Sequence, residues 1–184
     1  MEIVIILGLI FLNGILSMSE IAMVSARKSR LETAAKKGSK TAKTALRLAN
    51  EPDRFLSTIQ IGITLIGILT GLYSGEALAG DLARWLETIG IPQAHSLTLA
   101  KGIIVILVTY LTLILGELVP KHLGMNAPEK IARLIARPME VLSKIASPFV
   151  WLLSASTQAV IRLTGLHAST ENKVTEEEIK AIIQ

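Results

Sequence analysis

The 184-residue chain contains no cysteine, which excludes disulfide bridges and thiolate metal sites. Charged residues make up only 18% of it and aromatic residues only 4%, whereas 51% are hydrophobic and the mean hydropathy is +0.53. A water-soluble domain of this size needs more charge on its surface. Aliphatic side chains dominate the apolar fraction, as in lipid-facing and closely packed helices. The composition therefore predicts an all-α integral membrane protein.

Three apolar stretches are long enough to cross a bilayer as helices, since about 20 residues suffice. They are Met1–Val24, Arg54–Leu78 and Lys101–Val119. The first could be read as a signal peptide, but it lacks a basic start and polar residues such as Asn13 and Glu20 interrupt it. We therefore expect three transmembrane helices, with juxtamembrane belt helices formed by the segments between and after them.

The segments that join the spans differ in composition. Residues Ala26–Asn50 are rich in Ala, Lys and Arg, which predicts a basic helix lying along the membrane surface. Residues Gly80–Ala100 read as a polar connection that holds a short amphipathic helix at Leu82–Ile89. The two connections therefore belong to opposite sides of the membrane.

The region after the third span mixes apolar turns with charges. We expect it to form helices around the cytoplasmic ends of the bundle, with Pro138 and Pro148 as kinks or helix starts. A re-entrant segment at Ile145–Ile161 remains an alternative. We expect residues 1–170 to form one membrane domain, and the acidic segment 171–184 to begin a linker with a helix of its own.

The basic residues predict the orientation. Only Arg84 and Lys101 lie between the second and third spans, whereas nine basic residues lie between the first and second. By the positive-inside rule, the amino terminus of this multi-pass inner-membrane protein is outside and the carboxyl terminus cytoplasmic. The net charge of +4 then favours phospholipid headgroups, and not nucleic acid, as the partner. The nine residues are Arg27, Lys28, Arg30, Lys36, Lys37, Lys40, Lys43, Arg47 and Arg54.

Two carboxylates, Glu20 and Glu117, lie near the cytoplasmic ends of the first and third spans. A carboxylate inside a membrane is usually paired or placed in a polar cavity, so we expect a positive group at this depth. Asn13 and Ser17 precede Glu20 on the same helix face. Oxygen ligands without thiolate or imidazole suit hard cations such as Mg²⁺, Ca²⁺ or Na⁺.

Two further features bear on an ion site. Pro120 has no N–H to donate to the carbonyl of Gly116, so that oxygen is available to a ligand. The second span adds Thr58, Gln60 and Thr64, with Gly62 allowing close backbone approach.

A plainer alternative stays open, in which the two carboxylates are only helix-end ion pairs. Glu20 would pair with Arg27 or Lys28, and Glu117 with Lys121 four residues later.

A stripe of glycines follows the second span at four-residue spacing: Gly67, Gly71 and Gly75. Such a stripe lets a neighbouring backbone approach closely, and we interpret it as a packing surface for dimerisation.

Three ordered blocks carry a resemblance to a known family. They read N-G-I-L-S-M-S-E, then F-L-S-T-I-Q-I-G-I-T-L-I-G-I, then G-E-L-V-P-K. Together they resemble the transmembrane domain shared by bacterial CorC / hemolysin C-like proteins and eukaryotic cyclin M (CNNM) magnesium transporters. The resemblance covers essentially the whole chain, and S-x-S-E with G-E-x-x-P-K makes it specific.

The resemblance implies a homodimer that exports Mg²⁺, with Na⁺ as a candidate coupling ion. It also implies that a cytoplasmic pair of CBS modules, absent from this chain, binds nucleotide, and that residues 171–184 lead to it. Carried over by position, the metal-contacting candidates are Ser17, Ser19, Glu20, Gly62, Thr64, Gly116 and Glu117.

One position departs from the family pattern. Many relatives read G-N-T-L in the second block, whereas this chain has Ile63 in place of the asparagine. Thr64 or backbone carbonyls are left to supply that ligand, and the choice among cations stays open.

Two functions are compatible with the sequence: a Mg²⁺ transporter, or a Mg²⁺-sensing or scaffolding membrane protein that regulates other transporters without moving ions. We expect no enzyme, since no Ser/His/Asp set stands in a plausible arrangement.

Overall fold

The computed structural model describes residues 1–163, and every regular element within them is a helix. The described chain divides into two units, Met1–Ser147 and a second that begins at Pro148, and each is considered by itself. The predicted linker at 171–184 lies outside the described residues. The elements are α1 (Glu2–Ser25), α2 (Lys28–Lys36), α3 (Lys40–Asn50), α4 (Pro52–Thr88), α5 (Gln93–Leu113), the π-helix η1 (Ile114–Leu118), α6 (Val119–Asn126) and α7 (Pro128–Leu163).

Three helical stretches are long and apolar enough to cross a membrane, which confirms the predicted three spans. They are α1, α4 and the continuous run α5–η1–α6, with mean hydropathies of 2.1, 1.8 and 2.4 in their most apolar windows. The second is longer than predicted, because α4 has 37 residues. At 1.5 Å per residue it measures about 55 Å and extends past the roughly 30 Å hydrocarbon layer.

The connection between α4 and α5 is much shorter than the sequence suggested. The prediction of a polar segment at Gly80–Ala100 with a separate helix at Leu82–Ile89 is wrong, because α4 continues to Thr88 and α5 begins at Gln93. Small residues cause this, since Ala83 and Ala100 are buried where the two helices pack. Gly90 then takes a positive φ of 97°, and the chain reverses over four residues.

The basic segment forms two helices instead of the single one predicted. Gly38 adopts a φ of 91° between α2 and α3, a conformation that ends the first helix. Leu31, Ala45 and Leu48 are buried against the spans, so the apolar faces of these helices contact protein. Their basic faces remain exposed, which makes α2 and α3 belt helices.

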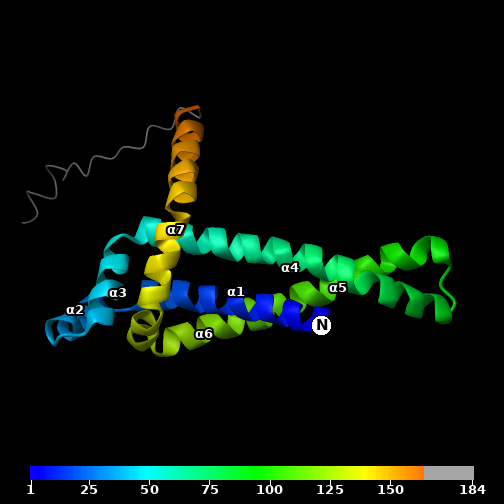
Figure 1. The fold of residues 1–184 in the computed structure, drawn as a ribbon, viewed down its shortest axis with the longest axis horizontal. Helices are drawn as coiled ribbons and strands as arrows, with labels where there is room; N and C mark the ends of the chain where they lie inside the picture. Colours follow the sequence, from blue (N-terminus) through cyan, green and yellow to red (C-terminus); the bar gives the residue numbers. More distant parts are fainter. Residues whose placement is uncertain (164–184) are drawn as a thin grey trace, which may run out of the picture. The chain divides into compact units, whose positions relative to one another are not determined.

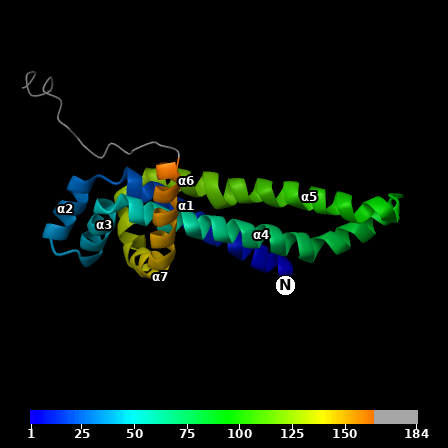
Figure 2. The ribbon, with the colours of Figure 1, turned by 90° about the horizontal axis from the view of Figure 1, so that it is seen from above.

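Unit Met1–Ser147 has two distinct ends, as both views show (Figures 1 and 2). At the belt end, α2, α3 and the first part of α7 gather where α1 ends and α4 begins. At the hairpin end, α4 and α5 continue alone to the turn at residues 89–92. α5–η1–α6 returns from the hairpin end to the belt end.

The main apolar core lies at the belt end and includes α7. Ala132, Ile135, Ala136 and Met139 of α7 are buried at helical spacing against α1, α3 and α4. Neither Pro138 nor Pro148 begins a helix, because both lie inside α7. The helix begins instead at another proline, Pro128, whose fixed φ suits the first helical position. The part of α7 up to Ser147 is therefore packed against the membrane helices.

Candidate functional site

The two membrane carboxylates meet one lysine at the belt end. Lys121 Nζ lies 3.0 Å from Glu117 Oε1 and 3.5 Å from Glu20 Oε2. The side chains are partly exposed, at 32% for Lys121, 40% for Glu117 and 27% for Glu20. The expected positive group is therefore Lys121, and Glu20 takes it as partner in place of the proposed Arg27 or Lys28. The plainer pairing of Glu117 with Lys121 is present as predicted.

The third span changes its helical pitch beside this cluster. Residues Ile114–Leu118 form a π-helix that ends two residues before Pro120. Because Pro120 has no N–H, Gly116 lacks its α-helical donor, and its oxygen accepts from Asn13 Nδ2 of α1 at 3.1 Å. The carbonyl was predicted to be free for an ion, and here it positions an amide from another helix. Short π-helical turns inside α-helices are frequent at functional sites.

Two oxygens on the same face of α1 are buried without a partner in the described chain. They are Asn13 Oδ1 and Ser17 Oγ, in side chains that are only 4% and 1% exposed. Their four-residue spacing stacks them on one side of the helix. A buried polar atom without a hydrogen bond costs about 1–3 kcal/mol, so a bound cation would find two ready acceptors.

Glycines allow the backbones to approach this closely. A Cβ on Gly14 would lie 3.0 Å from the Leu115 oxygen, and one on Gly116 would lie 3.2 Å from the Ile10 oxygen. A Cβ on Gly124 would come within 2.7 Å of the Met18 oxygen. The crossing of α1 with η1 and α6 therefore depends on three glycines, of which the sequence interpretation named only Gly116. Glycines spread over several helices give no periodic signal within any one of them.

The remaining predicted ligands lie in different surroundings. Ser19 is fully buried, and its hydroxyl donates to the Ile15 carbonyl of its own helix at 2.6 Å. Gly62 faces α1, because a Cβ there would lie 2.7 Å from Leu16 Cδ1. Thr64 is exposed on α4. Thus, Ser17, Gly116, Glu20 and Glu117 lie at the contact between the first and third spans, while Gly62 marks where α4 meets α1.

The neighbouring side chains of α4 are also accounted for. Thr58 is buried and donates to the Arg54 carbonyl at 2.8 Å, so its hydroxyl hydrogen is used locally. Ile63, which departs from the family pattern G-N-T-L, packs against the apolar core. In this chain the buried amide oxygen at the site comes from Asn13 of α1 instead.

Within residues 1–163, no cluster of three or more His, Cys, Asp or Glu side chains is arranged to hold a metal ion. A cation here would be held by hydroxyl, amide and carbonyl oxygens with two carboxylates nearby. Such a mixed oxygen set suits a hard cation.

Comparison with known proteins gives the family. The cyclin M transmembrane N-terminal domain matches residues 4–184. UPF0053 protein sll0260 of Synechocystis is 47% identical over 100% of this chain and 41% of its own length. UPF0053 protein YhdT of Bacillus subtilis is 31% identical over 95% of this chain and 38% of its own. A protein of Escherichia coli K12 named polyamine export protein is 29% identical over 100% of this chain and 41% of its own.

The family resemblance predicted from the three sequence blocks is thus confirmed. The chain spans about two fifths of the length of the relatives it matches. With three apolar spans, belt helices and a match over nearly its whole length, the chain belongs to the family of cyclin M transmembrane N-terminal domains.

Proposed function

We propose that this chain is the membrane part of a Mg²⁺ exporter, with Na⁺ as a candidate coupling ion. In this proposal it works as a homodimer in the cell membrane, with its amino terminus outside. Nucleotide binding is assigned to cytoplasmic CBS modules outside this chain, and no bond chemistry is involved. The observation that carries the proposal is the pair of buried oxygens of Asn13 and Ser17, which have no hydrogen-bond partner within residues 1–163 and lie on the helix that also carries Glu20.

The chemistry of Mg²⁺ supports this assignment. Mg²⁺ prefers six oxygen ligands at about 2.1 Å and gives up its water reluctantly, so several oxygens and a negative charge are needed. Asn13 Oδ1 and Ser17 Oγ provide neutral oxygens, and Glu20 and Glu117 provide charge. Lys121 balances one of the two negative charges. An arriving cation competes with its ammonium for the carboxylates, and this competition keeps affinity low enough for release.

The main test is flux in proteoliposomes that contain a Mg²⁺-sensitive dye. Glu117→Gln keeps the size of the side chain and removes one charge, so we expect flux to fall at least about tenfold, as for a lost charged ligand. Mg²⁺ binding without flux in the parent protein would instead favour the sensing or scaffolding role. An unchanged flux in Glu117→Gln would leave Glu117 as a helix-end partner of Lys121 only.

The two serines of the first block provide a matched pair of variants. Ser17→Ala removes an unpartnered buried hydroxyl, so we expect Mg²⁺ stabilisation to weaken while the fold without Mg²⁺ is unaffected or slightly more stable. Ser19→Ala removes a hydroxyl that already donates to its own helix, so a smaller change in Mg²⁺ response is expected. Thermal unfolding with and without Mg²⁺ measures both. Equal responses would mean that Ser17 is not a ligand.

A second candidate cargo is an organic polyamine. The carboxylate pair already holds an alkylammonium group, that of Lys121, and a relative is named polyamine export protein. Spermidine added to the Mg²⁺ flux assay separates the two. We expect it to compete weakly, because spermidine spreads its charges along a flexible chain, whereas Mg²⁺ concentrates two charges on one small ion that oxygen ligands surround. Efflux of labelled spermidine without Mg²⁺ flux would reverse the assignment.

A further inference from the structure

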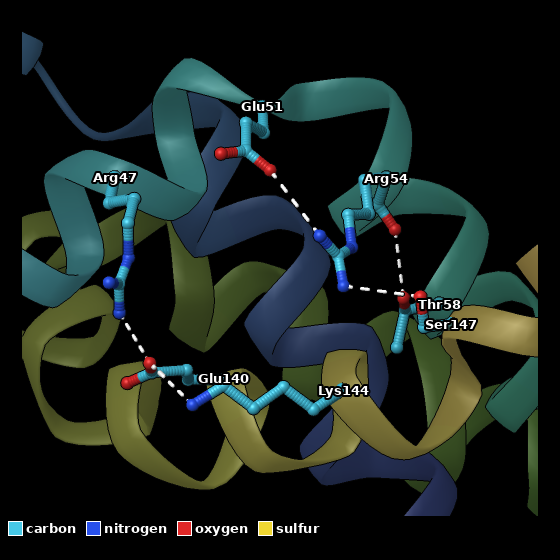
Figure 3. Close-up of polar contacts among 7 residues, drawn as sticks. All are labelled: Arg47, Glu51, Arg54, Thr58, Glu140, Lys144 and Ser147. Atoms are coloured by element: carbon cyan, nitrogen blue, oxygen red, sulfur yellow. Dashed lines mark hydrogen bonds and ion pairs between the residues drawn. The ribbon is translucent and has the colours of Figure 1, made fainter.

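A polar cavity lies at the belt end, and none of its lining residues belongs to the carboxylate pair. It has a volume of about 260 Å³ and is formed by α3, the start of α4 and α7. Its lining includes the buried residues Leu48, Phe55 and Ser143. Five charged residues also line it, and Figure 3 shows them. The charged residues are Arg47, Arg54, Lys144, Glu51 and Glu140.

The charges around this cavity do not balance. Arg47 and Lys144 share a single carboxylate, that of Glu140, with Lys144 Nζ at 3.2 Å from it (Figure 3). Arg54 is held loosely. Its Nη1 lies 3.9 Å from Glu51 Oε2, and its Nη2 donates to the neutral hydroxyl of Ser147 at 3.3 Å. Three cations therefore face two carboxylates, and one positive charge is left for a ligand.

The donor groups suit a phosphate. Guanidinium groups bind phosphate oxygens through paired N–H donors, and a lysine adds a point charge. The cavity is slightly smaller than typical ligand pockets, which span about 300–1,000 Å³, so it fits only a compact group such as a phosphate headgroup. It also joins three helices, so an occupant would tie α7 to the second span.

The position favours a lipid as the source of that phosphate. Arg54 stands two residues after the start of α4, where the apolar span begins, so we expect lipid headgroups at its level. Beside Lys144 on α7, Val141 and Ile145 are 57% and 66% exposed. Exposed apolar side chains next to a cationic pocket serve a molecule that has both a phosphate and hydrocarbon.

We propose that the cavity between α3, α4 and α7 binds the phosphate group of an anionic phospholipid, through Arg54, Arg47 and Lys144. The bound lipid links the second span to the belt helix α7. This inference is independent of the cargo, since it uses none of the residues of the carboxylate pair.

The test titrates phosphatidylglycerol or phosphatidylcholine into the purified full chain in detergent and follows thermal unfolding. We expect phosphatidylglycerol to stabilise the parent protein more, and Lys144→Gln and Arg54→Gln each to raise its half-maximal concentration about tenfold. Lys144 is 71% exposed, so its variant keeps the fold even if Arg54→Gln does not. The matched control is Arg84→Gln, an exposed arginine at the hairpin end that pairs with Asp81 in its own helix.

The outcomes separate the possible sources. Inorganic phosphate that reproduces the shift, with the same loss in Lys144→Gln, keeps the phosphate site but overturns its assignment to a lipid. The proposal is overturned if phosphatidylglycerol acts no better than phosphatidylcholine. It is also overturned if Lys144→Gln and the Arg84→Gln control respond alike.

Discussion

The belt end and the hairpin end of the unit Met1–Ser147 differ in the surroundings of their glycines. At the belt end, Gly14, Gly116 and Gly124 are in contact with a neighbouring helix. Glu20 and Lys121 pair there, and the oxygens of Asn13 and Ser17 have no partner within residues 1–163. Toward the hairpin end, a Cβ added at Gly71 or Gly75 would meet no atom within 4 Å, and a groove of about 490 Å³ runs along these glycines.

Glycine spacing alone therefore does not identify a helix contact. The regular stripe of α4 faces outward in the single chain, while the irregular glycines of α1, η1 and α6 make the close crossing. At the belt end, the close crossing of α1 with η1 and α6 brings the carboxylates and Lys121 of two spans together.

The largest expected effect concerns the side of the membrane on which the belt end and the hairpin end each lie. The chain has no cysteine, so Lys37→Cys at the belt end and Gln93→Cys at the hairpin end each introduce a single thiol. Because α4 and α5 each cross the membrane, we expect an impermeant maleimide added outside to label Gln93→Cys and to spare Lys37→Cys in intact cells. Labelling of both from the same side would contradict the three-span topology and the distinction between the two ends.

The contrast between the two glycine sets is tested by adding one methyl group. A Cβ at Gly124 would lie 2.3 Å from Ile21 Cγ2 and 2.7 Å from the Met18 oxygen, so Gly124→Ala should destabilise the fold by about 1–3 kcal/mol. Gly71→Ala meets nothing, so better helix propensity should stabilise it by up to about 1 kcal/mol. Thermal unfolding in detergent shows whether each variant is more or less stable than the parent protein. The same sign for both variants would remove the distinction between the two glycine sets.

The cluster of Glu20, Glu117 and Lys121 is tested by removing its positive charge and one of its negative charges in separate variants. Lys121→Gln leaves Glu20 and Glu117 without their shared cation, so we expect lower stability without Mg²⁺ and a larger stabilisation by Mg²⁺. Glu117→Gln should act in the opposite direction and reduce the Mg²⁺ response. Lys101→Gln, an exposed lysine of α5, is the control and should leave the response unchanged. If Lys121→Gln weakens the Mg²⁺ response, the lysine supports binding instead of competing with it.

The groove along Gly71 and Gly75 should affect the contact between two copies of the chain, and not the fold of a single copy. Gly71→Ile adds a side chain where the single chain has free space, so we expect monomer stability to change little and dimer dissociation to become easier. Sedimentation in detergent as a function of protein concentration measures the second effect. A dimer as strong as that of the parent would mean that this face contacts lipid.

The smallest expected effect concerns pH at the belt. The hydrogen bond from Lys144, with the nearby charges of Arg47 and Lys144, lowers the pKa of Glu140 below its usual 4.5. A lowered folded pKa adds stability that is present above about pH 4.5 and is lost as the pH falls toward the folded value. The difference in unfolding temperature between the parent and Glu140→Gln should therefore shrink from about pH 6 to about pH 4. A difference that grows on acidification would contradict this ion pair.

The class of protein, the number of spans and the family could all be predicted from the sequence. Long apolar runs admit few alternatives in a membrane, because backbone groups there must be satisfied within helices. The sequence also placed Glu20 and Glu117 at one depth, since both helices run the same way. The prediction of a polar connection at residues 80–100 was wrong. There α4 and α5 continue beyond the apolar segments and pack through small residues such as Ala83 and Ala100.

Which groups meet depended on the tertiary structure. The sequence offered Arg27, Lys28 and Lys121 as partners for the carboxylates, and the crossing of α1 with α6 brought Lys121 to both. The same crossing turned the Gly116 carbonyl toward Asn13 and left two oxygens unpartnered within the described chain. Asn13 and Gly116 are 103 positions apart, and their distance depends on glycines in separate helices. No periodicity within one segment records such a pairing, because it is fixed by how closely two backbones can approach.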